Sequence, residues 1–119
     1  MKIRRPRWRA ATGAARLSEF VTVARVSDIP PGQIRVKDIP GARVAICNVE
    51  GTFYAVEDRC THDDGPLGEG LLEGDEIECP RHGARFNVKT GDVTCLPAVV
   101  PIRAYDVRVV GGDVQVAPK

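Results

Sequence analysis

Two short segments carry both histidines of the chain, and each histidine closely follows a cysteine. The first segment is Cys60-Thr61-His62, and the second is Cys79-Pro80-Arg81-His82. Thiolate and imidazole are soft and borderline ligands, which suit zinc or iron–sulfur centres. The chemistry that we expect of these side chains is therefore the binding of a transition metal.

The division of the ligands between the two segments narrows the choice of metal. A structural zinc site of the Cys2His2 type groups its cysteines in one pair and its histidines in the other. Here each segment supplies one of each. This arrangement suits a two-iron cluster in which two cysteines hold one iron and two histidines hold the other. A zinc site with mixed pairs and a chance grouping of core residues are the alternatives.

The two segments, together with the Gly83-Ala84-Arg85-Phe86 run after the second, resemble the ligand motifs of Rieske-type [2Fe–2S] proteins. The resemblance extends over about residues 20–117. It implies one [2Fe–2S] cluster per chain, with thiolates on one iron and imidazoles on the other. The four ligands that it implies are Cys60, Cys79, His62 and His82.

Four further residues have expected roles around this site. The resemblance implies that Leu67 covers the cluster and that Pro97, in a third loop, screens it. Of the two remaining cysteines, Cys47 lies within an apolar run and is expected to be a small buried hydrophobe. Cys95 is expected to be a free structural thiol, which would be reactive only if exposed.

The composition predicts one small all-β domain. The chain has 119 residues, of which 43% are hydrophobic, and it is rich in Gly (12) and Pro (9). Short Val- and Ile-rich runs separated by Gly and Pro indicate an antiparallel β-sandwich or small barrel. We expect the Rieske domain to span residues 19–119, with a cluster-binding subdomain inserted at about residues 58–96. No apolar run has membrane-spanning length.

Alternation of polar and apolar residues, with turn residues between, places the expected strands. They are residues 20–24, 33–37, 44–48, 53–56, 71–72, 76–78, 85–88, one or two strands within 99–110, and 113–116. The first four form a meander that presents the Cys60 loop at one end of the sheet.

The first 18 residues form a basic arm. Residues 1–16 contain six arginine or lysine residues and no acidic residue. Arg4-Arg5 is not followed by the apolar segment of an export signal. A transit peptide or a phosphate-binding arm is conceivable, but the composition favours a disordered, solvated tail. We expect no nucleic-acid and no membrane partner.

The residues around the ligand motifs select a branch of the resembling family. Its high-potential respiratory members have a disulfide between the two ligand loops, where this chain has Gly65 and Arg81. They also have a serine and a tyrosine where this chain has Ala84 and Phe86. The resemblance is thus to a soluble Rieske ferredoxin, an electron carrier that is not catalytic alone.

Such a carrier would be a cytoplasmic protein, expected to be a monomer. The partners that the resemblance implies are a flavin-dependent reductase and a terminal non-haem iron oxygenase, such as a ring-hydroxylating enzyme. Two other functions remain open: the small subunit of an NADH-dependent assimilatory nitrite reductase, and a redox-sensing or iron–sulfur-assembly accessory protein. The intact set of four ligands favours the ferredoxin.

Overall fold

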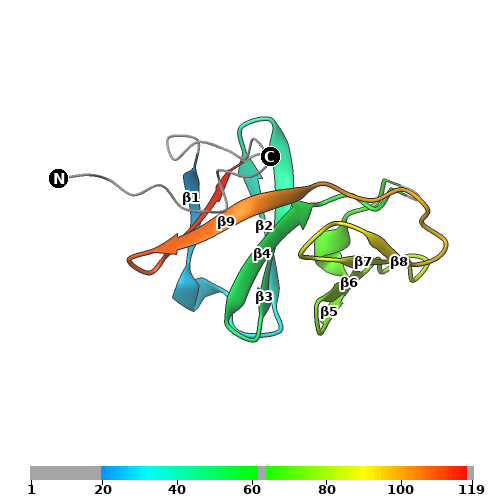
Figure 1. Ribbon diagram of the computed structural model, residues 1–119, viewed down its shortest axis with the longest axis horizontal. Coiled ribbons are helices and arrows are strands. Elements are labelled where there is room, and N and C mark those ends of the chain that lie inside the picture. Colours follow the sequence, from blue (N-terminus) through cyan, green and yellow to red (C-terminus); the bar gives the residue numbers. More distant parts are fainter. Residues whose placement is uncertain (1–19, 62–63, 118–119) are drawn as a thin grey trace.

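The computed structural model describes residues 20–61 and 64–117. The expected arm at residues 1–18 lies outside the described residues, so its disorder stays a prediction. The described chain forms two antiparallel sheets, and the smaller one lies beside one end of the larger (Figure 1). The all-β prediction is confirmed.

The larger sheet has six strands in the order β1-β10-β9-β4-β3-β2, and we call it the framework. Its strands are β1 (Val21–Arg25), β2 (Ile34–Ile39), β3 (Ala42–Val49), β4 (Thr52–Glu57), β9 (Ala104–Val110) and β10 (Asp113–Ala117). The two edge strands, β1 and β2, also contact one another, so the sheet is nearly closed. A single turn of 3-10 helix, η2 (Val26–Asp28), follows β1.

The smaller sheet has four strands in the order β5-β6-β7-β8, and we call it the second sheet. Its strands are β5 (Leu71–Glu73), β6 (Glu76–Glu78), β7 (Arg85–Asn87) and β8 (Val93–Cys95). A 3-10 turn, η3 (Leu67–Glu69), precedes it. The chain leaves the framework after β4 and returns to it at β9 (Figure 1).

The turns follow from local sequence. Glu50-Gly51 joins β3 to β4 with both residues at positive φ, 52° and 95°. Gly111-Gly112 joins β9 to β10 in the same way, with φ of 56° and 88°. Two successive residues at positive φ make the turn whose twist matches a two-residue hairpin. Glycine accepts this conformation without strain, which explains Gly51, Gly111 and Gly112, whereas Glu50 is a non-glycine residue at positive φ.

Strand β3 explains why the molecule has two cores. Side chains alternate between the faces of a strand. Val44 and Ile46 lie in the core enclosed by the framework, whereas Ala45 and Cys47 lie in the core shared with the second sheet. All four are fully buried. A continuous apolar run is what a strand covered on both faces requires, and β3 thus separates the two cores.

Candidate metal centre

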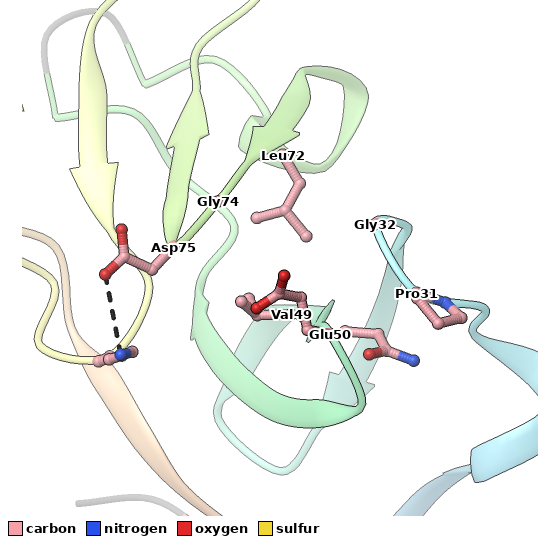
Figure 2. A pocket seen from close by; sticks show the side chains of 9 residues that line it. Pro31, Gly32, Val49, Glu50, Leu72, Gly74 and Asp75 are labelled. Atoms are coloured by element: carbon pink, nitrogen blue, oxygen red, sulfur yellow. Dashed lines mark ion pairs between the residues drawn. The ribbon is translucent and has the colours of Figure 1, made fainter.

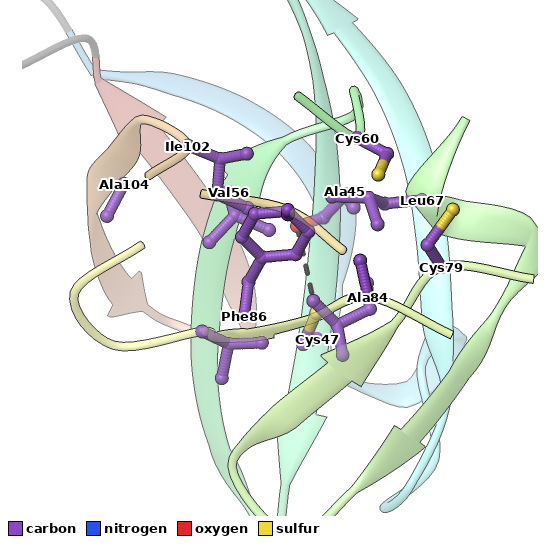
Figure 3. Close-up of a cluster of buried hydrophobic side chains, with 13 residues drawn as sticks. Ala45, Cys47, Val56, Cys60, Leu67, Cys79, Ala84, Phe86, Ile102 and Ala104 are labelled. Atoms are coloured by element: carbon purple, nitrogen blue, oxygen red, sulfur yellow. Dashed lines mark hydrogen bonds between the residues drawn. The ribbon is translucent and has the colours of Figure 1, made fainter. Parts of the chain in front are cut away.

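The core shared by the framework and the second sheet contains the two cysteines of the ligand motifs. Cys60 and Cys79 are 0% and 1% exposed. Both belong to the same buried cluster as Leu67, Ala84 and Phe86. Figure 3 shows the two thiols at the same edge of this cluster, beside Leu67. Sequence motifs that are far apart in the chain are therefore brought together around one buried edge.

The backbone makes the same turn at each of the two cysteines. The amide of Cys60 donates to the carbonyl of Gly65 (2.8 Å), and the amide of Asp64 donates to the carbonyl of Cys60 (2.7 Å). Likewise, the amide of Cys79 donates to the carbonyl of Ala84 (2.7 Å), and that of Gly83 donates to the carbonyl of Cys79 (3.1 Å). Both cysteines thus close a loop through the residues four and five positions later.

A left-handed residue completes each of these turns. Gly83 has φ of 77°, and Asp64, at the equivalent position of the first loop, has φ of 62°. Aspartate is one of the few residues other than glycine that visit this region. The carboxylate of Asp64 also accepts a hydrogen bond from Arg59 (2.8 Å). The described residues of the two loops therefore share the same pair of hydrogen bonds and a left-handed residue at the same position, and each loop presents a buried thiol.

The histidines are placed less completely than the cysteines. His82 is exposed, and His62 lies outside the described residues. Within residues 20–61 and 64–117, no three potential ligands among His, Cys, Asp and Glu gather as a metal site would require. The structure thus brings the two thiols into one core, and the assignment of all four ligands stays a prediction.

The two residues expected to screen the cluster, Leu67 and Pro97, differ in burial. Leu67 is 0% exposed and packs in the core with both thiols. Pro97 is half-buried in the loop after β8. This loop is tied to the first ligand motif, because the hydroxyl of Thr61 donates to the carbonyl of Val100 (2.5 Å). Their contact with a cluster stays a prediction.

The other two cysteines differ sharply from one another. Cys47 is fully buried, and burial raises the pKa of its thiol to about 12. The prediction of a small buried hydrophobe is confirmed. Cys95 is exposed at the end of β8, a strand that the sequence analysis missed. It is therefore an accessible thiol rather than a packed one.

Two arginines near the site pair with neighbouring acidic residues. Hydrogen bonds to Glu57 and then to Asp64 raise the pKa of Arg59. Arg85 contacts three glutamates, Glu73 (2.8 Å), Glu76 (3.3 Å) and Glu78 (2.7 Å), and hydrogen bonds to the three raise its pKa as well. Both guanidinium groups stay charged at any ordinary pH.

A cavity of about 420 Å³ lies away from the two thiols, between the second sheet and the framework. Figure 2 shows Gly74 and Asp75 on one side of it and Pro31 and Gly32 on the other, with Val49 and Glu50 below. Asp75 forms an ion pair with Lys89 at its rim (3.8 Å). The thiols of Cys60 and Cys79 do not line this cavity.

Comparison with known proteins agrees with this site. The family model described as Rieske [2Fe-2S] domain matches residues 19–106. The chain belongs to this family, which binds one [2Fe–2S] cluster. The residues fit such a group, because Cys60 and Cys79 offer two buried thiols that are not joined in a disulfide.

Individual relatives are ferredoxins of dioxygenase systems. The chain is 46% identical over 90 residues to the 3-phenylpropionate/cinnamic acid dioxygenase ferredoxin subunit of Escherichia coli strain K12, covering 75% of this chain and 84% of that protein. The solved ferredoxin of carbazole 1,9a-dioxygenase from Nocardioides aromaticivorans IC177 is 40% identical, with a TM-score of 0.81, covering 84% of this chain and 98% of that one.

A second solved structure contains a ferredoxin together with its oxygenase. It is the complex of reduced oxygenase and oxidized ferredoxin in carbazole 1,9a-dioxygenase, and one of its chains is 45% identical to this one. The TM-score is 0.79, and the match covers 83% of this chain and 93% of that chain.

In the part of the chain that the structure describes, no helix has the length and apolar character needed to cross a membrane.

Proposed function

We propose that this protein is a one-electron carrier between protein partners, with its [2Fe–2S] cluster held by Cys60, His62, Cys79 and His82. The observation that carries the proposal is the pair of equivalent loops, each of which presents a buried thiol. When bound, the cluster takes up and releases single electrons at a low potential. With all four ligand positions filled by protein groups, we propose that the chain catalyses no reaction alone.

The surrounding residues control water and polarity around the two thiols. Leu67, Ala84 and Phe86 are each 0% exposed in the same core, and none carries a hydroxyl. The side chains thus exclude water without donating hydrogen bonds to sulfur. Because such bonds favour the more negative reduced state, the lack of a hydroxyl at these three positions predicts a potential near the low end of the Rieske range, about −150 mV.

We propose a flavin-dependent reductase as the electron donor and a terminal non-haem iron oxygenase as the acceptor. The relatives named above are ferredoxin components of dioxygenase systems, and one solved structure contains a ferredoxin with its oxygenase. These relatives support the carrier over a nitrite reductase subunit or an accessory protein. Cytoplasmic location and a monomeric state stay predictions.

The loop between β8 and β9 is the candidate contact surface for these partners. It exposes three large apolar side chains, Leu96 (70%), Val99 (75%) and Val100 (54%). Its link to Thr61 places it directly against the first ligand motif. A partner that binds this loop would have a short electron-transfer path to the thiols. Burial of the exposed apolar side chains against that partner would also favour association.

Several acidic residues near the site form ion pairs with neighbouring bases and offer reduced charge for docking. Glu73 and Glu76 pair with Arg85, Asp75 pairs with Lys89, and Asp64 pairs with Arg59. Such pairs reduce the net potential that a basic partner would meet. We nevertheless expect a contribution from electrostatic docking to a basic partner, with a transfer rate that falls as salt rises.

Analysis of the purified protein tests the proposed cofactor. We expect two irons and two acid-labile sulfides per chain, and a Rieske-type paramagnetic spectrum on reduction. Replacing either histidine by alanine should abolish that spectrum while leaving the framework folded. Stoichiometric zinc without sulfide, in protein produced with ample iron, would refute the proposal.

The contact surface has its own test with a matched control. Val99→Ser should slow electron transfer to the oxygenase severalfold, because an apolar anchor is lost from the interface. The control is Val109→Ser, where the valine is also half-exposed (50%). It belongs to the β9–β10 hairpin, whose turn lies at the opposite end of the framework from the second sheet (Figure 1). Equal rates in the two variants would exclude docking through the β8–β9 loop.

A further inference from the structure

The 3-10 turn η3 (Leu67–Glu69) is fastened to the segments that precede both cysteines. The amide of Gly68 donates to Oδ1 of Asp58 (2.6 Å), and Asp58 lies two residues before Cys60. On the other side, Gly70 lies against the backbone carbonyl of Glu78, the residue before Cys79. The turn therefore connects the two cysteine loops directly.

Both attachments depend on the absence of a side chain. A Cβ atom on Gly68 would overlap Cγ2 of Val36 in β2, and it would lie 3.2 Å from Oδ1 of Asp58. A Cβ atom on Gly70 would overlap the carbonyl oxygen of Glu78. The two glycines are thus required by the close approach of the Val36 side chain and of the Glu78 carbonyl, respectively.

Asp58 is an unusual residue to find at this position. Its side chain is only 2% exposed, although it carries a carboxylate. A buried carboxylate is costly unless hydrogen bonds compensate for the lost water. Among residues 20–61 and 64–117, its carboxylate accepts from the Gly68 amide and lies 3.5 Å from Nε of Arg43, whose side chain is 65% exposed. The short bond to the turn is the better of the two.

The turn carries the side chain that closes the buried edge of the site. Leu67 is 0% exposed and packs in the same core as Cys60 and Cys79. If the Asp58 bond were lost, Leu67 would no longer be held from the Cys60 side. Water would then reach the thiols more easily, and the spacing of the two loops would be less fixed.

We propose that Asp58 is a positioning residue for the cluster, whose carboxylate holds the Leu67 turn in place between the two cysteine loops. This inference rests on the proposed function, since it assumes a cluster at Cys60 and Cys79. It assigns to Asp58 control over two properties: the rate at which iron is lost and the reduction potential. Because reduction adds negative charge, better access of water favours the reduced state and raises the potential.

A pair of substitutions separates the hydrogen bond from the charge. Asp58→Ala and Asp58→Asn remove the same charge, but only asparagine keeps a carbonyl oxygen that can accept from Gly68. We expect the alanine variant to release iron to a chelator about tenfold faster than the asparagine variant, as the loss of a hydrogen bond at a buried site implies. We also expect its potential to be the higher of the two. Arg43→Gln, which leaves the Gly68 contact intact, should match the wild type in iron release.

A second pair tests the same turn from the glycine side. Gly68→Ala should release iron faster, because the new methyl group overlaps Val36. Adding Val36→Ala removes Cγ2, and the double variant should recover most of the wild-type rate. Val36→Ala alone is the control for the change in β2. This pair decides the question if Asp58→Ala does not fold.

Hydrogen exchange of the cluster-loaded protein shows where each variant acts. In Asp58→Ala, exchange should rise in a peptide covering residues 65–71 and stay unchanged in one covering residues 42–49. Equal iron release and equal potentials in the alanine and asparagine variants would overturn the proposal, as would faster exchange in both peptides. Wild-type protein without iron and sulfide would refute the proposed function instead.

Discussion

The framework and the second sheet differ in the length of their strands and in whether they enclose a core of their own. Framework strands are five to eight residues long, whereas each strand of the second sheet has three. The framework encloses an apolar core of its own, with Val44, Ile46 and Val114 fully buried. The second sheet has no separate core and shares one with β3 and β4.

The difference shows what each part needs in order to fold. A sheet of very short strands buries too little apolar surface to be stable alone. The shared core also contains two thiols at its edge, where a bound metal would replace packing as the source of stability. Binding and folding are then linked in the second sheet but not in the framework.

Removal of the metal is the strongest test of this contrast. Treatment with acid and chelator should remove protection from hydrogen exchange across residues 64–97, because the loops lose the bonds that hold the thiols together. Framework amides in β3 and β10 should stay protected. Exchange measured by mass spectrometry on loaded and metal-free protein would decide. Loss of protection in both sheets at once would mean that the two parts form a single cooperative unit.

A matched pair of core truncations should distinguish the two regions next. Ile46 in β3 and Ile77 in β6 are both 0% exposed. Ile46→Ala should lower the free energy of unfolding of the framework by about 2–5 kcal/mol. Ile77→Ala should instead speed the release of iron, while urea unfolding of the metal-free framework stays near that of the wild type. Equal effects of the two substitutions on the metal-free protein would contradict the separation.

Thiol reactivity offers a smaller but sharper distinction. At pH 8 the cluster-loaded protein should show one rapidly reacting thiol per chain, Cys95, and Cys95→Ser should remove it. Cys47 keeps its proton because burial raises its pKa from 9.0 to about 12. The neutral thiol therefore stabilises the fold below about pH 9, and this contribution is lost as the pH rises towards 12. Rapid reaction of two thiols in the intact protein would contradict this assignment.

The smallest expected effect concerns the potential. Phe86 is buried in the shared core, and Phe86→Tyr would add one hydroxyl there. If it donates to a cysteine sulfur, a gain of about 1 kcal/mol on reduction corresponds to a rise of roughly 40 mV. Ala84→Ser should act in the same direction. Voltammetry on the wild type and both variants measures the shift.

A hydroxyl bonded to a backbone carbonyl instead would leave the potential unchanged. No shift in either variant would mean that neither position faces sulfur. An iron assay accompanies each measurement and would detect a loss of iron in either variant.

Local sequence predicted those elements of this fold that depend on neighbouring residues. The β9–β10 hairpin was visible because both of its turn residues are glycine, and the β3–β4 hairpin because Gly51 interrupts two alternating runs. The pairing of β4 with β9, and of β1 with β10, joins segments far apart in the chain, and no local pattern encodes it. The strand β8 was not predicted, and its pairing with β7 is irregular in register.

Local sequence likewise predicted some features of the site and not others. The type and spacing of the ligands indicated the metal centre, because few chemistries need such a set. The roles of Asp58 and Gly68 were not predicted, since an aspartate before a loop usually indicates a solvated turn. Their significance depends on the approach of Val36 from another strand. The pairing of three glutamates with Arg85 likewise follows from the register of β5, β6 and β7.

The ends of the inserted segment meet at one point of the framework. The amide of Glu57 donates to the carbonyl of Arg103 (2.8 Å), and a carboxylate oxygen of Glu57 accepts from the amide of Arg103 (3.1 Å). A segment whose two ends lie side by side can be replaced by one of another length, because the entropic cost of closing a loop grows only slowly with its length. Residues 58–102 could therefore be replaced by a short connection, leaving a six-stranded scaffold open to other grafted sites.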